Sequence, residues 1–238
     1  MGYIIFYLKT HPEENMLPHY ENKLNEIRIM VCDVLSDIIS SSKSTLIAFK
    51  TDDISLYESA KSKIKNLQSN TNKIDNEIIK IFALFAPEAA ELRLLVAYLK
   101  MTNEINRIGD GVRKYSKQLS DYHSRGSDMV TLKNSIILLH QTTIDALECI
   151  KNCLDTLEQC DSEDIHTKVL IEESKNDDLF SIVEKELLGF IIDSGELGLE
   201  YIKILSTLRR LERIGDRGVN IASLLLYAQK GGKLNIHH

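Results

Sequence analysis

The sequence predicts an all-α protein built as two tandem three-helix bundles related by an internal repeat. Apolar residues recur every three or four positions over long stretches, which is the spacing of one face of a helix. The chain of 238 residues has only 11 glycines and 3 prolines, so few positions interrupt a helix. The tetrapeptide Arg-Ile-Gly-Asp at residues 107–110 recurs without a gap at residues 213–216. Such self-similarity at a fixed spacing indicates one structural unit written twice.

Three helices are expected in the first half. The first extends from about residue 18 to 49, and the second from about 54 to 85 after a turn at residues 51–53. The second helix has an apolar seam in regular three- and four-residue steps, which favours side-by-side packing of long helices at shallow angles. Pro87 then begins a third helix, which extends to about residue 122, because proline suits the first turn of a helix.

The second half repeats this plan. Residues 123–127 are the expected linker, near the midpoint of the chain. The fourth helix is expected over 128–160, and the fifth from an acidic cap after residue 160 to about 192. The sixth opens at 193–196 and extends to about Lys230, where two glycines stop it.

The expected domains are therefore a first bundle at residues 16–123 and a second at 128–232. Residues 1–15 are expected to form an extension packed loosely outside the bundles, or else translation begins at Met16. The extension is apolar but lacks the basic start and cleavage site of a signal peptide. No uncharged run reaches the roughly 20 residues of a membrane span, so a soluble, cytoplasmic protein is expected. The net charge of −6 argues against a nucleic-acid-binding protein.

Four cysteines, Cys32, Cys149, Cys153 and Cys160, allow two interpretations. Cys149 and Cys153 are four residues apart, a spacing that a thiolate metal site uses. However, Cys153 and Cys160 are in register with the apolar seam of the fourth helix. We therefore interpret the cysteines as buried structural residues with free thiols, which fits a reducing cytoplasm.

The second copy of the repeat places two carboxylates on one helix face. Glu212 and Asp216 are four residues apart, about one turn of helix, so their like charges repel. A cation between them would reverse the sign of that interaction. In the first copy Asn106 and Asp110 have the same spacing and lie roughly opposite the apolar side of their helix. They are expected to face outward or toward a neighbouring surface.

The fifth helix has four further acids, Glu172, Glu173, Asp177 and Asp178, and packing against the sixth helix could bring some of them toward this pair. Clustered carboxylates without an adjacent histidine or cysteine suit cations bound through oxygen, such as Mg, Ca, Mn or Fe. Glu163 and His166 form the only Glu-x-x-His pair, whereas a ferritin-type di-iron site needs two. No nucleophile motif is present, and a non-enzyme is expected. A carboxylate-bridged metal-dependent enzyme and a metal-free helical scaffold remain as alternatives.

The segment from Glu212 to Arg217, followed by Asn220 and Ile221, resembles the PhoU family, the phosphate-transport regulators of bacteria. Residues 90–93, followed by 106–110, look like the corresponding part of the first repeat. The resemblance extends over nearly the whole chain from about Leu17. It implies a PhoU-like fold of two three-helix bundles, with metal ions bound at surface motifs of the form Glu/Asp-x-x-x-Asp.

The resemblance also implies which residues would bind the metal. Glu212, Asp216 and Asp110 match the motifs directly, whereas Asn106 stands where the family usually has glutamate and offers only a neutral oxygen. The acidic motif of the second helix falls near residues 64–68, where no acid remains. Its counterpart on the fifth helix falls near residues 174–178, which leaves Asp177 and Asp178. The implied ligand is a divalent or ferric ion, namely Fe, Zn, Mg or Mn.

The implied role is negative regulation of phosphate uptake and of the phosphate-starvation response. A PhoU-type regulator couples the phosphate-specific ABC transporter at the inner membrane to a sensor histidine kinase, and silences the response when phosphate is plentiful. By resemblance the protein is cytoplasmic and reaches the inner membrane through these partners. Long amphipathic helices often leave an apolar stripe exposed, so a homodimer is expected, and no nucleic-acid partner is.

Overall fold

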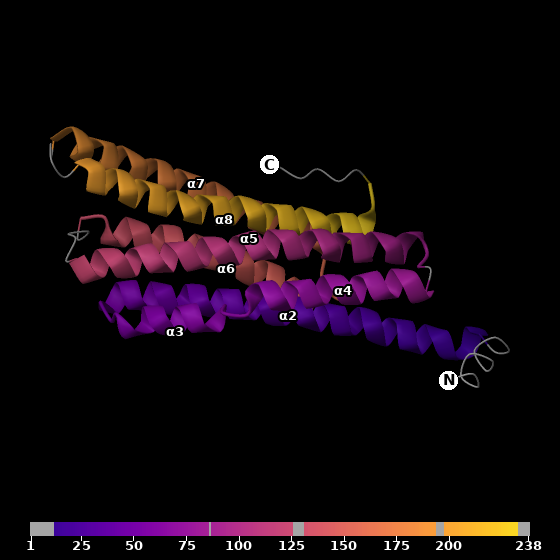
Figure 1. The fold of residues 1–238 in the computed structure, drawn as a ribbon. Helices are drawn as coiled ribbons and strands as arrows, with labels where there is room; N and C mark the ends of the chain where they lie inside the picture. Colours follow the sequence, from indigo (N-terminus) through magenta and orange to yellow (C-terminus); the bar gives the residue numbers. More distant parts are fainter. Residues whose placement is uncertain (1–11, 86, 126–130, 194–197, 233–238) are drawn as a thin grey trace.

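The computed structural model describes residues 12–85, 87–125, 131–193 and 198–232, and within these ranges all regular structure is helical (Figure 1). In chain order the helices are α2 (Pro12–Thr51), α3 (Ser55–Lys63), α4 (Leu67–Phe85), α5 (Ala89–Arg125), α6 (Lys133–Asp155), α7 (Ser162–Asp193) and α8 (Gly198–Lys230). The prediction of an all-α fold in two three-helix bundles is confirmed. None of these helices has a stretch long and apolar enough to cross a membrane.

The first bundle contains α2, α3, α4 and α5. Helices α3 and α4 lie end to end along α2 and together take the place of one long helix (Figure 1). The prediction of one continuous second helix was wrong, because a turn at residues 64–66 separates α3 from α4. Ile64, with φ −106° and ψ 20°, ends α3. Ile64 and Leu67 are 1% and 4% exposed, so both sides of the break are packed in the core. The apolar period continues across the break, and no glycine or proline marks it.

The second bundle contains α6, α7 and α8. Helix α8 ends as expected at two glycines with left-handed backbone, Gly231 at φ 76° and Gly232 at φ 93°. The Gly231 amide donates a hydrogen bond of 2.9 Å to the Tyr227 carbonyl. At the other end of the chain, α2 begins at Pro12, four residues before the expected start of the first bundle. The prediction for the extension otherwise lies outside the described residues.

Cys153 and Cys160 form a disulfide, so the prediction of free thiols was wrong for this pair. On one continuous helix two Cα atoms seven residues apart would be separated by about 10.5 Å. Here α6 ends at Asp155, five residues before the end that the sequence predicts. The chain then turns, and the two Cα atoms lie 5.2 Å apart. Cys32 and Cys149 are free, the first buried and the second half-buried.

The two bundles pack against each other through α5 and α8 and through α2 and α6, and their buried residues form one continuous core. Helices α5 and α8 are antiparallel, as polar pairs along their length show. Arg217 contacts Glu104 at 2.9 Å, and near the other end the Tyr122 hydroxyl lies 3.1 Å from the Thr207 hydroxyl.

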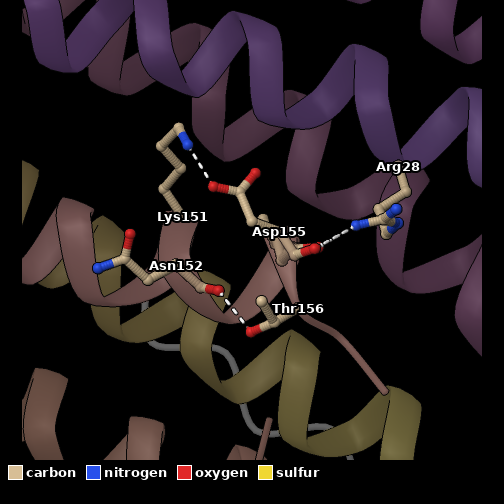
Figure 2. A network of polar contacts seen from close by, with 6 residues as sticks. Arg28, Lys151, Asn152, Asp155 and Thr156 are labelled. Atoms are coloured by element: carbon tan, nitrogen blue, oxygen red, sulfur yellow. Dashed lines mark hydrogen bonds and ion pairs between the residues drawn. The ribbon is translucent and has the colours of Figure 1, made fainter. Parts of the chain in front are cut away.

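Arg28 of the first bundle caps the C-terminus of α6 in the second (Figure 2). Its Nη1 donates hydrogen bonds to the carbonyls of Leu154 (2.9 Å) and Asp155 (2.7 Å). The last carbonyls of a helix lack partners within the helix, and a basic side chain there also interacts favourably with the helix dipole. Lys151 pairs with the Asp155 side chain on the same turn. An element of one bundle is thus completed by a side chain of the other.

Candidate metal centre

Three carboxylates from α7 and α8 converge on the surface of the second bundle. One oxygen each of Glu173, Asp177 and Asp216 lies within 4.8 Å of the other two. Glu173 and Asp177 are four residues apart on α7, so they share one face of that helix, and Asp216 lies on the adjacent α8. Within the described ranges no other set of histidine, cysteine or acidic side chains comes together in this way.

Glu212 is the fourth member of what we call the carboxylate cluster: Glu173, Asp177, Glu212 and Asp216. Burial raises the pKa of Glu212, and the negative charges of Asp216 and Asp177 raise it further, against Arg209 and Arg213. Burial likewise raises the pKa of Glu173, with additional contributions from Asp177, Asp216 and Glu212. Each glutamate is therefore influenced electrostatically by the same two aspartates.

Asn176, the neighbour of Asp177, ties this part of α7 to α6. Its side chain is 1% exposed, and its Nδ2 donates to the Leu139 carbonyl (3.0 Å), to Thr142 (2.8 Å) and to Thr143 (3.0 Å). Its Oδ1 is buried and has no hydrogen-bond partner among the described residues. Gly215 of α8 faces this part of α7. A Cβ added at Gly215 would lie 3.9 Å from Asn176 and from Glu173, an ordinary van der Waals contact. The cluster thus rests on a well-packed contact between two helices.

These residues fit a hard cation. Bonds to Ca²⁺ are about 2.3–2.6 Å long and bonds to Mg²⁺ about 2.0–2.1 Å, so oxygens that lie within 4.8 Å of one another can contact one ion after small adjustments. The donors are all carboxylates, and burial together with their mutual repulsion raises the pKa of Glu173 and of Glu212. A bound cation would oppose both shifts, because it favours the ionised form of each ligand.

The equivalent place in the first bundle lacks this chemistry. At the repeat spacing of 106 residues, the four cluster positions correspond to Leu67, Thr71, Asn106 and Asp110. The Thr71 hydroxyl donates to the Asn106 Oδ1 at 2.9 Å, a neutral hydrogen bond between α4 and α5. Leu67 packs over Gly109, where an added Cβ would meet the Leu67 Cδ2 at 2.2 Å. Only Asp110 is acidic, and it pairs with Arg113 at 3.2 Å.

The structure thus brings together the oxygens of two of the six residues that the sequence singles out, Asp177 and Asp216, and a third, Glu212, is influenced electrostatically by both. Asn106 and Asp110 lie on α5 in the other bundle, and Asp178 is exposed and outside the group of converging oxygens. The converging pair of α7 is Glu173 and Asp177, one residue earlier in the sequence than the expected motif at 174–178. The signal that could have assigned Glu173 to the site is its four-residue spacing from Asp177, which equals the spacing of Glu212 and Asp216.

The chain belongs to the PhoU family, since the PhoU domain model matches residues 33–119 and again residues 145–225, which is more than half of the sequence. The two matched segments end 106 residues apart, at the same spacing as the repeated tetrapeptide. The internal repeat is therefore a duplication of the PhoU domain.

Two relatives illustrate the extent of the similarity. The phosphate-specific transport system accessory protein PhoU of Edwardsiella tarda is 28% identical over 158 residues, which cover 66% of this chain and 63% of that protein. The match therefore spans less than two-thirds of this relative. The protein of the same name from Escherichia coli K12 is 22% identical over 212 residues, or 89% of this chain and 86% of its own.

Solved structures show the same fold. The crystal structure of PhoU from Pseudomonas aeruginosa superposes with a TM-score of 0.82 at 20% identity, covering 90% of this chain and 100% of that one. The phosphate transport system regulatory protein PhoU from Streptococcus pneumoniae gives a TM-score of 0.73 at 18% identity, covering 91% and 99%.

Proposed function

We propose that this protein is a PhoU-type accessory regulator that represses phosphate uptake and the phosphate-starvation response when phosphate is plentiful. The observation that supports this most directly is the pair of PhoU domains, whose matched segments extend from residue 33 to 225. The relatives are named as accessory proteins of a phosphate-specific transport system. By extension, the partners of this chain are the phosphate-specific ABC transporter at the inner membrane and a sensor histidine kinase, which it couples from the cytoplasm, and it forms a homodimer.

The carboxylate cluster is the proposed metal site of this regulator. Glu173, Asp177, Glu212 and Asp216 would hold a divalent or ferric ion, with Fe, Zn, Mg and Mn as candidates. The positive charge of a bound ion would offset the repulsion between the carboxylates and so stabilise the contact between α7 and α8. Support comes from the all-oxygen donor set, from the raised pKa values of Glu173 and Glu212, and from the absence of such a set at the equivalent described positions of the first bundle.

The regulatory proposal is tested by complementation. A bacterial strain that lacks its own PhoU protein and contains a phosphate-starvation reporter should express the reporter at high phosphate. Producing this chain should repress it. Affinity capture from membranes of the native host grown at high phosphate should recover the transporter and the kinase. Reporter expression that remains high despite stable, folded protein would contradict the proposal.

The metal proposal has a separate readout. Metal content per chain, measured by elemental analysis, should fall in the double variant Glu212→Gln/Asp216→Asn and change little in Asp110→Asn, since affinity for hard cations follows the number of anionic ligands. Circular dichroism should show unchanged helicity in both, because exposed and half-buried acids contribute little to the core. Equal metal content in the wild type and the double variant would leave the cluster as a surface without a bound ion.

A further inference from the structure

Helices α5 and α8 lie side by side (Figure 1). Between them, on the face of α8 that does not bear the carboxylate cluster, lies a cleft. This cleft has a volume of about 240 Å³. Five basic side chains line it, and we call it the basic cleft: Arg107 and Lys114 from α5, and Arg210, Arg213 and Arg217 from α8. It lies at the junction of the two bundles, so each bundle contributes to it.

Helical geometry explains why one short segment of α8 serves two surfaces. Arg210, Arg213 and Arg217 follow the spacing of one helix face. Glu212 lies about 200° around the helix from Arg210, since each residue turns the helix by about 100°. On α5, Arg107 and Lys114 are seven residues apart and therefore lie on one face. The antiparallel packing of α5 and α8 brings the two basic faces together.

The helices approach closely at the middle of the cleft. A Cβ added at Gly111 of α5 would lie 3.1 Å from the Ile214 side chain of α8. Both residues line the cleft between its basic side chains. The backbone positions of the arginines and the lysine are therefore fixed relative to one another by helix packing, rather than by a loop.

Two of the arginines are already oriented by neighbours. Nη1 of Arg217 donates to Glu104, whose carboxylate is only 7% exposed, at 2.9 Å. Nε of Arg210 donates to the Gln118 side chain at 3.1 Å. A guanidinium group has five N–H donors, so each arginine retains donors for a ligand. Holding the side chain in place in advance lowers the entropy lost on binding.

The other three basic residues have no such partner. Arg107, Lys114 and Arg213 make no ion pair or hydrogen bond with any described residue. The cleft also contains Asp110, but this carboxylate pairs with Arg113. Counting both pairing partners, the cleft has six basic and two acidic side chains, a local net charge of +4 on a chain whose net charge is −6. This local excess of positive charge favours a bound anion.

We propose that the basic cleft binds a phosphate oxyanion. Arginine presents a planar fork of donors that matches phosphate oxygens two at a time, and phosphate has enough acceptors to satisfy several arginines. The volume is below the roughly 300–1,000 Å³ that drug-sized ligands usually occupy, so it admits a small anion or one phosphoryl group. The same chemistry accepts free orthophosphate or the end of a short polyphosphate chain. Either ligand would contact both bundles at once.

The test is titration calorimetry of the intact protein with orthophosphate and, separately, with tripolyphosphate, at constant ionic strength and with EDTA present. The chelator removes any phosphate bound through metal at the carboxylate cluster. We expect saturable binding at one site per chain for at least one of the two anions. Binding of orthophosphate identifies the free ion as the ligand, and binding of tripolyphosphate alone identifies the chain.

Two variants locate the binding. Arg213→Gln and Arg107→Gln should each weaken the affinity about tenfold or more, because each removes one charge-assisted contact to the anion. Arg209→Gln is the matched control, since it removes the same charge from the same helix. Arg209 pairs with Glu184 at 2.9 Å and lies over the Phe180 ring, outside the cleft. It also shares with Arg213 the effect of lowering the pKa of Glu212.

Three results would overturn the proposal. The first is no saturable heat for either anion. The second is an equal loss of affinity in R209Q and R213Q, which would show attraction to the general positive field instead of a site. The third is an affinity for chloride equal to that for the phosphates. Circular dichroism of each variant shows whether the fold is retained, and R107Q and R213Q report on the cleft from opposite helices.

Discussion

Two effects act on Glu173 and Glu212, namely burial between helices and repulsion from the charges of Asp177 and Asp216. Both raise the pKa of each glutamate above its ordinary value of 4.5. The folded protein therefore holds these protons more tightly than the unfolded chain does. The stability gained in this way is fully present below pH 4.5 and is lost as the pH rises through the raised pKa values.

Asp216→Asn should flatten this loss, because Asp216 contributes to both shifts. We expect the free energy of unfolding of metal-free wild type to fall relative to that of D216N as the pH rises from about 5 to about 8. Urea unfolding in EDTA at several pH values measures the difference. Asp178→Asn, which removes an exposed acid outside the converging group, is the control and should follow the wild type. Parallel curves for wild type and D216N would show that the cluster does not titrate in this way.

His140 gives a prediction of the opposite sign. Burial, together with the charge of Lys50, lowers its pKa from 6.5 to about 3. Its Nε2 lies 2.8 Å from the Ser42 hydroxyl, so it links α6 to α2. The unfolded chain binds a proton below about pH 6.5 and the folded protein does not. Stability is therefore fully present above that pH and is lost as the pH falls toward 3, by up to about 1.4 kcal/mol per pH unit.

His140→Gln removes this titration and retains a polar partner for Ser42. We expect the free energy of unfolding of the wild type to decrease more steeply than that of H140Q between about pH 6 and about pH 4. His166→Gln is a suitable control, because His166 is only half-buried and contacts Ser223 on the same bundle. Equal slopes for wild type and H140Q would mean that His140 gains a proton within the fold.

Sequence reasoning at the residue scale succeeded where spacing alone decides the outcome. Glu212 and Asp216 share a face because they are four residues apart, and the fifth helix does bring an acid toward them. It failed where the answer depends on packing between elements. Glu173 was named among the nearby acids of the fifth helix but left out of the expected motif at 174–178, because a one-residue shift in register moves a different residue to the facing position. Cys153 and Cys160 form a disulfide only because α6 ends early, and no local signal marks that end.

The ends of the helices likewise divide into those that the sequence predicts and those that depend on packing. The positions of the long helices follow from the apolar period, and their ends follow where glycine or proline is present. The break between α3 and α4 has neither, and Ile64 and Leu67 keep the period on both sides of it. What the break provides is visible only in three dimensions, since Leu67 at the start of α4 fills the space over Gly109 of α5.

The repeat offers a matched pair of helix substitutions, Gly109→Ala and Gly215→Ala. In the first bundle the new methyl group would meet Leu67 at 2.2 Å, whereas in the second its nearest neighbours are at 3.9 Å. Alanine gains about 1 kcal/mol over glycine within a helix. At residue 215 this gain should appear as higher stability. At residue 109 overpacking costs about 1–3 kcal/mol, so we expect a net loss.

Urea unfolding of both variants measures this difference, with helicity as a check on the fold. The double variant Gly109→Ala/Leu67→Ala should be less destabilised than the sum of the two single changes, because removing Leu67 relieves the clash. If G109A proved as stable as G215A, Leu67 would have to change rotamer without loss, and the close contact would not constrain α4.

At the scale of the whole molecule, the two bundles share one core, although they are two copies by sequence. Their buried residues form a single core, and contacts from α2 and α5 complete α6 and α8. The repeat could be predicted from the tetrapeptide alone. The depth of the contact between the copies could not, because an apolar period shows which face is buried and not which helix covers it.

The second bundle alone should therefore not form a well-packed structure. Residues 131–232 contain all of α6, α7 and α8, yet without the first bundle α8 would lose its cover from α5 and α6 its cover from α2. We expect a helical but loosely packed state with a broad, non-cooperative thermal transition and binding of the dye ANS, whereas the full chain unfolds in one cooperative transition. Mixing the fragment with residues 12–125 should restore cooperativity. The measurement is thermal circular dichroism with ANS fluorescence. A sharp transition in the isolated fragment, without ANS binding, would show that each PhoU domain folds by itself and that the shared core is a docking surface between two finished domains.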